Sequence, residues 1–231
     1  MERELEHTAL LEASPMSVAA LFGPGCVAEV AMPASVEAQL FADERAHIAR
    51  AVPKRRAEFA TARVCARRAL ARLGVEPASL VPDDDGAPRW PAGIVGSISH
   101  TTALCAVVAA KAQRYLSLGL DLEQDKPLSP EIVAMICTAR ERRVLATHGA
   151  REAIVYFSAK EAFYKCQYPL TRRFLDFQDV ELSVDFARGE FRARVLETVG
   201  DPPPWLDLLT GRFARNGGLV MCGVALDAVA C

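Results

Sequence analysis

The sequence predicts an α+β fold for this chain of 231 residues. Helical and strand-like patterns occur in both halves of the chain, an order that is typical of this class. The composition, with 51% hydrophobic and 24% charged residues, is that of an ordinary globular protein. The length is sufficient for a good core, either as one domain or as two halves of about 115 residues.

Charge and cysteine content narrow the classes of partner. The net charge is -2, so there is no bulk basic field, and we expect no nucleic-acid partner. The seven cysteines form no CxxC pair, and most lie among apolar neighbours. Such cysteines are typical of buried free thiols in a reducing compartment.

The sequence also argues against secretion and against a membrane span. Residues 1–6 are acidic and lack the basic region of a secretory signal. Residues 90–110 carry no Asp, Glu, Lys or Arg, but their middle contains glycine, serine, threonine and histidine, which are costly in hydrocarbon. We therefore expect two short strands around a polar turn here, and a cytoplasmic protein without a membrane segment.

The first elements follow from prolines and apolar spacing. Residues 1–40 are expected to be irregular because prolines interrupt them, with one edge strand at 27–32. A helical pattern runs over 41–73, interrupted near Pro53, and its basic second part ends at Gly74. The apolar stripe of that second part leaves several arginines on its other faces.

Strands and helices follow in the middle and second half. A connection rich in Pro, Gly and Asp leads to strands at 94–99 and 103–110. A turn at 111–114 marks the midpoint, and the strand after it, 116–123, is expected to form a hairpin with 103–110. The remaining expected elements are helices at 130–136, from near 138, and at 151–167, then short strands within 174–199 and 210–229.

The central helix carries a charged motif. Glu161 and Lys165 are four residues apart and share one helix face, with Lys160 beside them. One interpretation is an ion pair on an exposed helix. The many aromatic neighbours of this segment instead favour a helix packed on several sides.

Two acids lie on the strand after the midpoint. Asp121 and Glu123 are two residues apart, so their side chains point to the same side of a sheet. The strand is otherwise apolar, and buried carboxylates need partners or a metal. The two interpretations are a Mg²⁺ site, which carboxylates and substrate phosphate would complete, and a plain surface strand end.

Possible phosphate ligands lie in two other segments. His100 ends a strand directly after Ser99, where it is either a structural histidine or a phosphate donor. The basic helix offers Arg55, Arg56 and Arg63, which either form a solvated face or grip phosphate. The sequence contains neither a P-loop nor a Rossmann glycine pattern, nor a zinc-type histidine spacing.

Taken in order, these segments resemble the 4′-phosphopantetheinyl transferases, most closely the Sfp/EntD-like group. The similarity runs from about residue 50 to about residue 180, and the ordered set is more specific than any one motif. The matching segments are 54–63 (KRRAEFATAR), 86–91 (GAPRWP), 96–100 (GSISH), 119–123 (GLDLE), 157–165 (FSAKEAFYK) and 170–173 (LTRR).

The resemblance implies a fold and a reaction. The fold would be α+β and monomeric, with two similar halves related by a pseudo-twofold axis and coenzyme A in the cleft between them. The halves would be 1–113, which binds the nucleotide, and 114–231, which holds the metal and catalytic residues. The reaction would be the Mg²⁺-dependent transfer of the phosphopantetheine arm from coenzyme A to a carrier-protein serine, releasing adenosine 3′,5′-bisphosphate.

The resemblance also implies residue roles. Asp121, Glu123 and Glu161 would hold Mg²⁺, and Glu161 would act as base toward the serine hydroxyl. Lys160 or Lys165 would stabilise or protonate the departing phosphate. The nucleotide and its phosphates would be bound by Arg55, Arg63, Ser99 and His100, with Arg56 as a weaker candidate.

The chain departs from the family pattern at three positions. Phe157 stands where many relatives have Trp, and Leu122 stands where some have a third carboxylate. Asp85 lies where some relatives place a lysine near the nucleotide, so Arg89 is the substitute candidate.

The expected protein partners are apo carrier domains of polyketide, nonribosomal peptide, siderophore or fatty-acid synthesis. Because carriers are acidic, a local basic rim is needed, and a solvated helix face is the other interpretation of the candidate rim: Arg140, Arg142, Arg143 and Arg151. Two other functions stay open, a Mg²⁺-dependent nucleotide or coenzyme A pyrophosphatase and a non-catalytic carrier-binding module.

Overall fold

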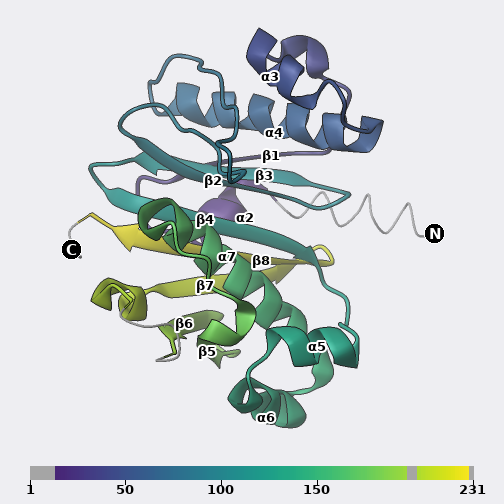
Figure 1. Cartoon of the computed structure of the whole chain (residues 1–231), viewed down its shortest axis with the longest axis vertical. Helices are drawn as coiled ribbons and strands as arrows, with labels where there is room; N and C mark the ends of the chain where they lie inside the picture. Colours follow the sequence, from purple (N-terminus) through teal and green to yellow (C-terminus); the bar gives the residue numbers. More distant parts are fainter. Residues whose placement is uncertain (1–13, 197–201, 229–231) are drawn as a thin grey trace.

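The computed structural model describes residues 14–196 and 202–228, and its elements form two antiparallel sheets with helices packed on them (Figure 1). The α+β prediction is confirmed. In chain order the elements are α2 (Pro15–Ala19), β1 (Val27–Ala31), η1 (Glu37–Gln39), α3 (Ala42–Ile48), α4 (Pro53–Arg72), β2 (Ile94–His100), β3 (Cys105–Lys111), β4 (Tyr115–Gln124), α5 (Pro130–Ile136), α6 (Ala139–His148), η2 (Ala150–Glu152), α7 (Ala153–Thr171), η3 (Phe177–Asp179), β5 (Val180–Asp185), β6 (Glu190–Val195), η5 (Pro204–Leu208), β7 (Thr210–Asn216) and β8 (Leu219–Asp227).

The first sheet has the order β1-β3-β2 and is covered by α4 (Figure 1). The small apolar side of α4 packs on Val107 and Ala109 of the central strand. Pro53 occupies the first turn of α4, where its missing N–H is harmless, and Gly74, with φ 74°, follows its end. The predicted edge strand and the helix break near Pro53 are confirmed.

The second sheet has the order β4-β8-β7-β6-β5, and α7 packs across β4 and β8. The buried side of α7 forms one core with the sheet, including Phe163 on the helix and Val224 on β8. The helix predicted at 151–167 begins and ends slightly later, at Ala153 and Thr171. It ends where Arg172 adopts φ 53°. The predicted strands in the tail are β5 to β8, while residues 197–201 and 229–231 lie outside the described residues.

The predicted hairpin of 103–110 and 116–123 is wrong. β3 pairs with β1 and β2, whereas β4 pairs with β8. The turn at 111–114 therefore carries the chain from one sheet to the other. Periodicity identified both strands correctly, but it carries no information about a partner as distant in sequence as β8.

The two sheets meet at a seam between β2 and β4, which is joined by serine side chains. Ser97 Oγ accepts a hydrogen bond from the Leu120 N–H at 3.0 Å, and Ser99 Oγ accepts one from the Leu122 N–H at 3.1 Å. These hydroxyls satisfy buried backbone donors at the edge of the second sheet. The seam therefore holds elements of both halves of the chain at a fixed distance.

A shared core reinforces the seam. Helix α2, which lies between the sheets in Figure 1, contributes Val18, and the chain after it contributes Phe22. They pack with Val108 of β3, Leu120 of β4 and other buried residues of both sheets. Apolar contacts cross the predicted boundary between residues 113 and 114. The division of the chain into two halves stays a prediction.

In the described ranges, no helix is long and apolar enough to cross a membrane. Six cysteines lie in these ranges and are free thiols, as predicted, and five of them are buried.

Candidate active site

The acids of β4 lie at the seam. Asp121 is only 3% exposed, and its Oδ1 accepts hydrogen bonds from Lys165 Nζ at 2.6 Å and from Ser99 Oγ at 3.1 Å. Its other oxygen, Oδ2, is buried and has no hydrogen-bond partner among the residues that the structure describes. A buried carboxylate oxygen without a partner is costly, so this atom is suited to bind a ligand that the protein itself does not supply.

Close packing of α7 on β4 brings Lys165 to Asp121. A Cβ on Gly119 would lie 1.9 Å from the Ala162 carbonyl oxygen, so only glycine allows this approach. Glu161 and Lys165, one turn apart, flank the contact and lie on the side of α7 that faces the seam. Lys165 contacts Asp121 directly, as the sequence predicts. Glu161 lies close enough to Asp121 for the charge of Asp121 to raise its pKa.

Two of the three carboxylates have a raised pKa. Burial, together with the charges of Asp121 and Glu161, raises the pKa of Glu123 to about 7. Burial, with a contribution from Asp121, also raises the pKa of Glu161, and Lys165 opposes this. Mutual repulsion of this kind is relieved by a divalent cation, and carboxylate oxygens are ligands that Mg²⁺ prefers.

The carboxylates do not form a ready-made metal cage. In the described part of the chain, no three His, Cys, Asp or Glu side chains are gathered closely enough to hold a metal ion. Lys165 donates a hydrogen bond to Asp121 Oδ1, so among the described residues only Asp121 Oδ2 lacks a partner on this side chain. The donor chemistry therefore fits Mg²⁺, and the predicted metal ligands Asp121, Glu123 and Glu161 stay a prediction.

A basic group lies on the neighbouring end of α4. Arg55 Nη1 lies 2.7 Å from His100 Nε2, so that ring nitrogen must be the acceptor and the imidazole neutral. Burial lowers the pKa of His100, which agrees with a neutral ring. Glu58 lies nearby, with a carboxylate oxygen 3.9 Å from Arg55 Nη1 and 3.7 Å from His100 Nδ1.

This basic group and an acid of β4 line the same cavity. The cavity has a volume of about 530 Å³, and its lining includes Lys54, Arg55, Glu58 and His100 together with Glu123. A second cavity of about 600 Å³ is lined by Glu161 and Lys165 of α7, by Ser97 of the seam and by Trp90 and Arg89. Residues of the seam and its neighbours therefore line two spaces large enough for parts of a nucleotide-sized ligand.

Two other arginines lie elsewhere. Arg63 is 5% exposed, its Nε donates to the Leu80 carbonyl at 2.7 Å, and its guanidinium lies 3.9 Å from the centre of the Phe59 ring. Burial lowers its pKa to about 10. Arg56 lies 3.6 Å from Glu37. Of the three arginines, Arg55 is therefore the best placed as an exposed phosphate ligand. The helical spacing put Arg63 on a polar face of α4, but in the structure Phe59 and the segment at Leu80 cover it.

Lys160 does not join the site. Its Nζ donates three hydrogen bonds of 2.8 Å, to Glu141 Oε2 and to the carbonyls of Ile136 and Phe177. The side chain is 2% exposed. Adjacent helical residues point about 100° apart, so Lys160 points toward α5, α6 and η3 while Glu161 lies nearer the seam. The prediction that Lys160 contacts the phosphate is corrected to a structural position, and Lys165 is the lysine of the site.

The predicted basic rim is largely occupied by local partners. Arg140 lies 3.3 Å from Glu181, and Arg151 lies 2.8 Å from Asp125. Arg142 donates to the Cys137 carbonyl. These contacts favour the interpretation as solvated helix faces.

The sequence did not indicate a role for two residues near the site. Ser97 joins the seam and Glu58 lies beside the basic group, and both belong to segments that match the family. Asp85, predicted as a departure, lies 3.4 Å from Arg172, which also pairs with Asp83 at 2.7 Å. The alternation of Ser97 and Ser99 and the spacing of Glu58 three residues after Arg55 were the available signals.

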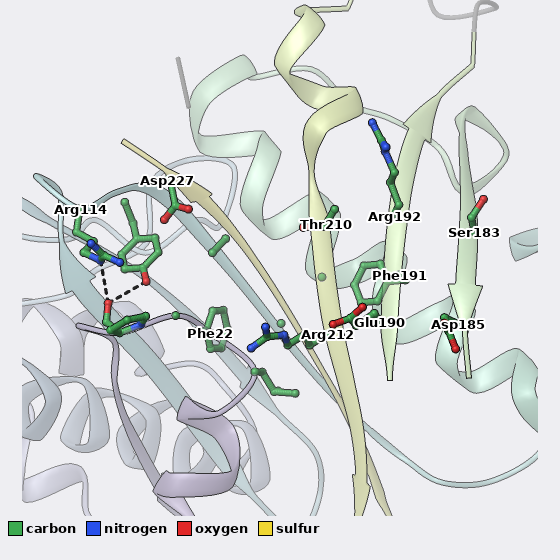
Figure 2. Close-up of a pocket in the computed structure, with 17 residues that line it drawn as sticks. Phe22, Arg114, Ser183, Asp185, Glu190, Phe191, Arg192, Thr210, Arg212 and Asp227 are labelled. Carbon is green, nitrogen blue, oxygen red and sulfur yellow. Dashed lines mark hydrogen bonds between the residues drawn. The ribbon is translucent and has the colours of Figure 1, made fainter. Parts of the chain in front are cut away.

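A third cavity lies apart from the seam. Figure 2 shows this hollow of about 520 Å³ on the second sheet, with Arg192, Arg212, Asp185 and Glu190 around it and Phe22 beside the strands. It contains none of the predicted site residues. Its charges are of both signs and give it no preference for a ligand class.

Comparison with known proteins gives matches along most of the chain. A family model described as the 4′-phosphopantetheinyl transferase N-terminal domain matches residues 43–110, and one of the 4′-phosphopantetheinyl transferase superfamily matches residues 117–207. The chain is 46% identical over 199 residues to 4′-phosphopantetheinyl transferase Svp of Streptomyces mobaraensis, covering 83% of this chain and 80% of Svp.

Two further relatives extend the comparison. 4′-Phosphopantetheinyl transferase PptT of Mycobacterium tuberculosis is 37% identical over 197 residues, which is 80% of this chain and 85% of PptT. Enterobactin synthase component D of Salmonella typhi is 31% identical over 117 residues, which is 48% of each chain.

Proposed function

This chain belongs to the Sfp/EntD-like group of the 4′-phosphopantetheinyl transferase superfamily and is an enzyme of that type, and we propose that its reaction is the Mg²⁺-dependent transfer of the phosphopantetheine arm of coenzyme A to a serine of apo carrier proteins. The other product is adenosine 3′,5′-bisphosphate. The observation that carries this proposal is the cavity that Lys54, Arg55 and His100 line together with Glu123. Cations for phosphate and an acid for a metal thereby line one space.

Arg55 and His100 bind the nucleotide end, chiefly its 3′-phosphate. Arg55 is exposed and charged, and the neutral imidazole of His100 has an N–H to donate. Arg56, Arg63 and Arg89 are weaker candidates, because Arg63 is buried and Arg56 is paired with Glu37, while Arg89 borders the other cavity.

Lys165 holds the pyrophosphate at the seam beside Ser99, whose single O–H donates to Asp121. Lys165 shares Asp121 with Ser99, so its ammonium is held 3.3 Å from the hydroxyl and oriented before substrate arrives. As the bond to phosphorus breaks, Lys165 stabilises or protonates the departing phosphate oxygen. Phosphoryl-type transfer depends mainly on such positioning and electrostatics.

Glu161 is the proposed base. Its raised pKa brings it closer to the pH at which it removes a proton from the carrier serine, and it borders the cavity that also contains Lys165. Asp121, Glu123 and Glu161 would hold Mg²⁺, which when bound would polarise the phosphorus and neutralise charge. Asp121 Oδ2 is the atom that needs such a partner most.

The wider setting is also proposed. We infer carrier domains of polyketide, nonribosomal peptide, siderophore or fatty-acid synthesis as acceptors, a monomeric protein and a cytoplasmic location. The free thiols agree with a reducing compartment.

The experiment is an intact-mass measurement on a panel of apo carrier domains. Protein, coenzyme A and Mg²⁺ are expected to add the mass of one phosphopantetheine arm, with no addition to a carrier whose acceptor serine is replaced by alanine or in the presence of EDTA. Coenzyme A turnover without any carrier would instead favour a pyrophosphatase. Tight carrier binding without mass gain would favour a non-catalytic module.

A further inference from the structure

Lys160 lies in a buried clamp that joins five elements of the second half, α5, α6, α7, η3 and β5. Its partner Glu141 is the third residue of α6, and Glu141 Oε2 also accepts the Thr138 N–H at 2.7 Å, while Oε1 accepts the Leu182 N–H of β5 at 2.7 Å. Lys160 itself donates to the carbonyls of Ile136 and Phe177. All three donors of the ammonium group therefore have acceptors, and both side chains are buried, at 2% and 0% exposure.

The first half contains the same arrangement. Glu44 is the third residue of α3, and Glu44 Oε2 accepts the Phe41 N–H at 2.9 Å, while Oε1 accepts the Leu80 N–H at 2.9 Å. Its cation is Arg67 of α4, which donates to Glu44 at 3.0 Å and to the Gln39 carbonyl at 2.8 Å.

The correspondence extends to sequence positions. Gln39 and Ile136, whose carbonyls accept from the two cations, each lie two residues before the N-cap of the short helix. The residue after each glutamate, Arg45 or Arg142, donates to the carbonyl just before that N-cap. The segments 42–45 (ADER) and 139–142 (ARER) are thus a short internal repeat that carries the clamp in each half.

We propose that Lys160 is a positioning residue, whose bond to Glu141 fixes α7 so that Glu161 faces the carboxylates of β4. This inference rests on the proposed function of Glu161. The clamp in the first half has no site residue next to its cation, because Arg67 is followed by the exposed Arg68. Lys160, in contrast, is followed directly by Glu161. The two clamps share their chemistry and differ in what they position.

The clamp also positions residues 174–177, which line a small cavity beside Glu161. This cavity of about 190 Å³ is lined by Lys160 and Glu161 of α7 and by residues 174–177. Lys160 holds that segment through the Phe177 carbonyl. Loss of the ammonium group would release residues 174–177 and the start of α6 from α7 together. Removal of groups that hydrogen-bond to metal ligands typically changes metal affinity about 10- to 100-fold, and we expect an effect in this range from the clamp.

The test compares K160M with the matched control R67M. The readouts are Mn²⁺ binding to the resting protein by electron paramagnetic resonance, thermal unfolding, and turnover. We expect both variants to be less stable, K160M to bind Mn²⁺ about 10- to 100-fold more weakly, and R67M to bind it within about twofold of wild type. If K160M does not fold, the double variants K160M/E141Q and R67M/E44Q are compared instead. Each double variant removes both charges of its clamp, so no unpaired buried charge is left.

Two outcomes would overturn the proposal. Folded K160M with wild-type Mn²⁺ binding and wild-type turnover would show that the clamp positions nothing in the site. Wild-type Mn²⁺ binding with turnover lowered more than about 100-fold would assign Lys160 a direct chemical role. Wild-type protein that neither binds Mn²⁺ nor modifies carriers would contradict the proposed function instead, so the two failures are distinguishable.

Discussion

At the level of single residues, the proposed reaction depends on the atoms around Asp121. One oxygen of Asp121 is shared by Lys165 and Ser99, and the other has no partner in the described ranges. The first oxygen prepares a cation for the phosphate, and the second is suited to a metal. A single buried carboxylate thus connects the two charges that the proposed reaction needs.

The first prediction concerns Lys165. Replacement by methionine, K165M, removes the cation expected to stabilise the departing phosphate, so kcat should fall by about 10²- to 10³-fold. The measurement is steady-state transfer to an apo carrier. K111M, at the exposed end of β3, is the control and should retain its rate. Equal rates for K165M and K111M would remove Lys165 from the mechanism.

The second prediction concerns Glu123 in metal-free protein. Its pKa is raised from 4.5 to about 7 in the folded state, mainly by burial. The folded protein therefore binds this proton more tightly than the unfolded chain does. The stabilising contribution is full below pH 4.5 and is lost as the pH rises through about 7. Urea unfolding in EDTA should show this loss in wild type.

The variant E123Q provides the comparison, because glutamine stays neutral at every pH. The difference in free energy of unfolding between E123Q and wild type should grow in favour of E123Q from pH 5 to pH 8. A difference that is independent of pH would mean that Glu123 is not desolvated as the structure indicates.

At the scale of elements, α7 and β4 form the site by packing at Gly119. The third prediction is that G119A is destabilised by about 1 to 3 kcal/mol and loses most of its activity, because the new Cβ would lie 1.9 Å from the Ala162 carbonyl oxygen. Urea unfolding and carrier transfer measure both effects.

The control for G119A is G74A. Gly74 has open space around its Cβ position but φ 74°, so alanine there causes backbone strain without a clash. G74A should lose about 1 kcal/mol of stability and keep its activity. If G119A behaved like G74A, the close approach of α7 to β4 would not be what sets the site.

The sequence predicted elements better than it predicted contacts. The helices of the basic and central segments were identified because apolar spacing, Pro53 and Gly74 act locally. The pairing of β4 with β8 was missed because strand partners are chosen by long-range packing. Lys160 was misassigned because spacing along a helix does not show which polar side chain a neighbouring element will satisfy, and the acceptors of Lys160 come from α5, α6 and η3.

Within the candidate site, type and order of residues were predictable and orientation was not. Asp121, Lys165, Ser99, Arg55 and His100 were all identified from sequence, and the structure places them around one seam. Arg63 belongs to the same motif as Arg55, yet it is buried against Phe59. Its burial depends on the loop that supplies Leu80, which carries no signal of this contact.

At the scale of the whole molecule, the two halves are joined by the serine seam and by a core that both sheets share. The fourth prediction is that they unfold together. The chain has two tryptophans, Trp90 beside the first sheet and Trp205 in η5 beside the second. The single-tryptophan variants W205F and W90F should therefore show the same urea midpoint by fluorescence once corrected for each substitution. Separate midpoints would show that the halves at 1–113 and 114–231 are independent folding units.

Because the seam joins β2 to β4, a substitution on β2 is expected to destabilise the contact with β4. S97A would leave the buried Leu120 N–H without its acceptor, which costs about 1 to 3 kcal/mol. Unlike Ser99, Ser97 makes no contact with Asp121 that the structure records, so its loss acts on the joint rather than on the chemistry.

The most direct test of the central claim is the intact mass of one apo carrier after incubation with coenzyme A and Mg²⁺, with wild type and E161Q side by side. We expect complete gain of one phosphopantetheine arm with wild type, and a rate lowered by about 10²- to 10⁴-fold with folded E161Q, because the base is lost. Carrier mass unchanged by wild type across the panel, or an equal gain with E161Q, would contradict that claim.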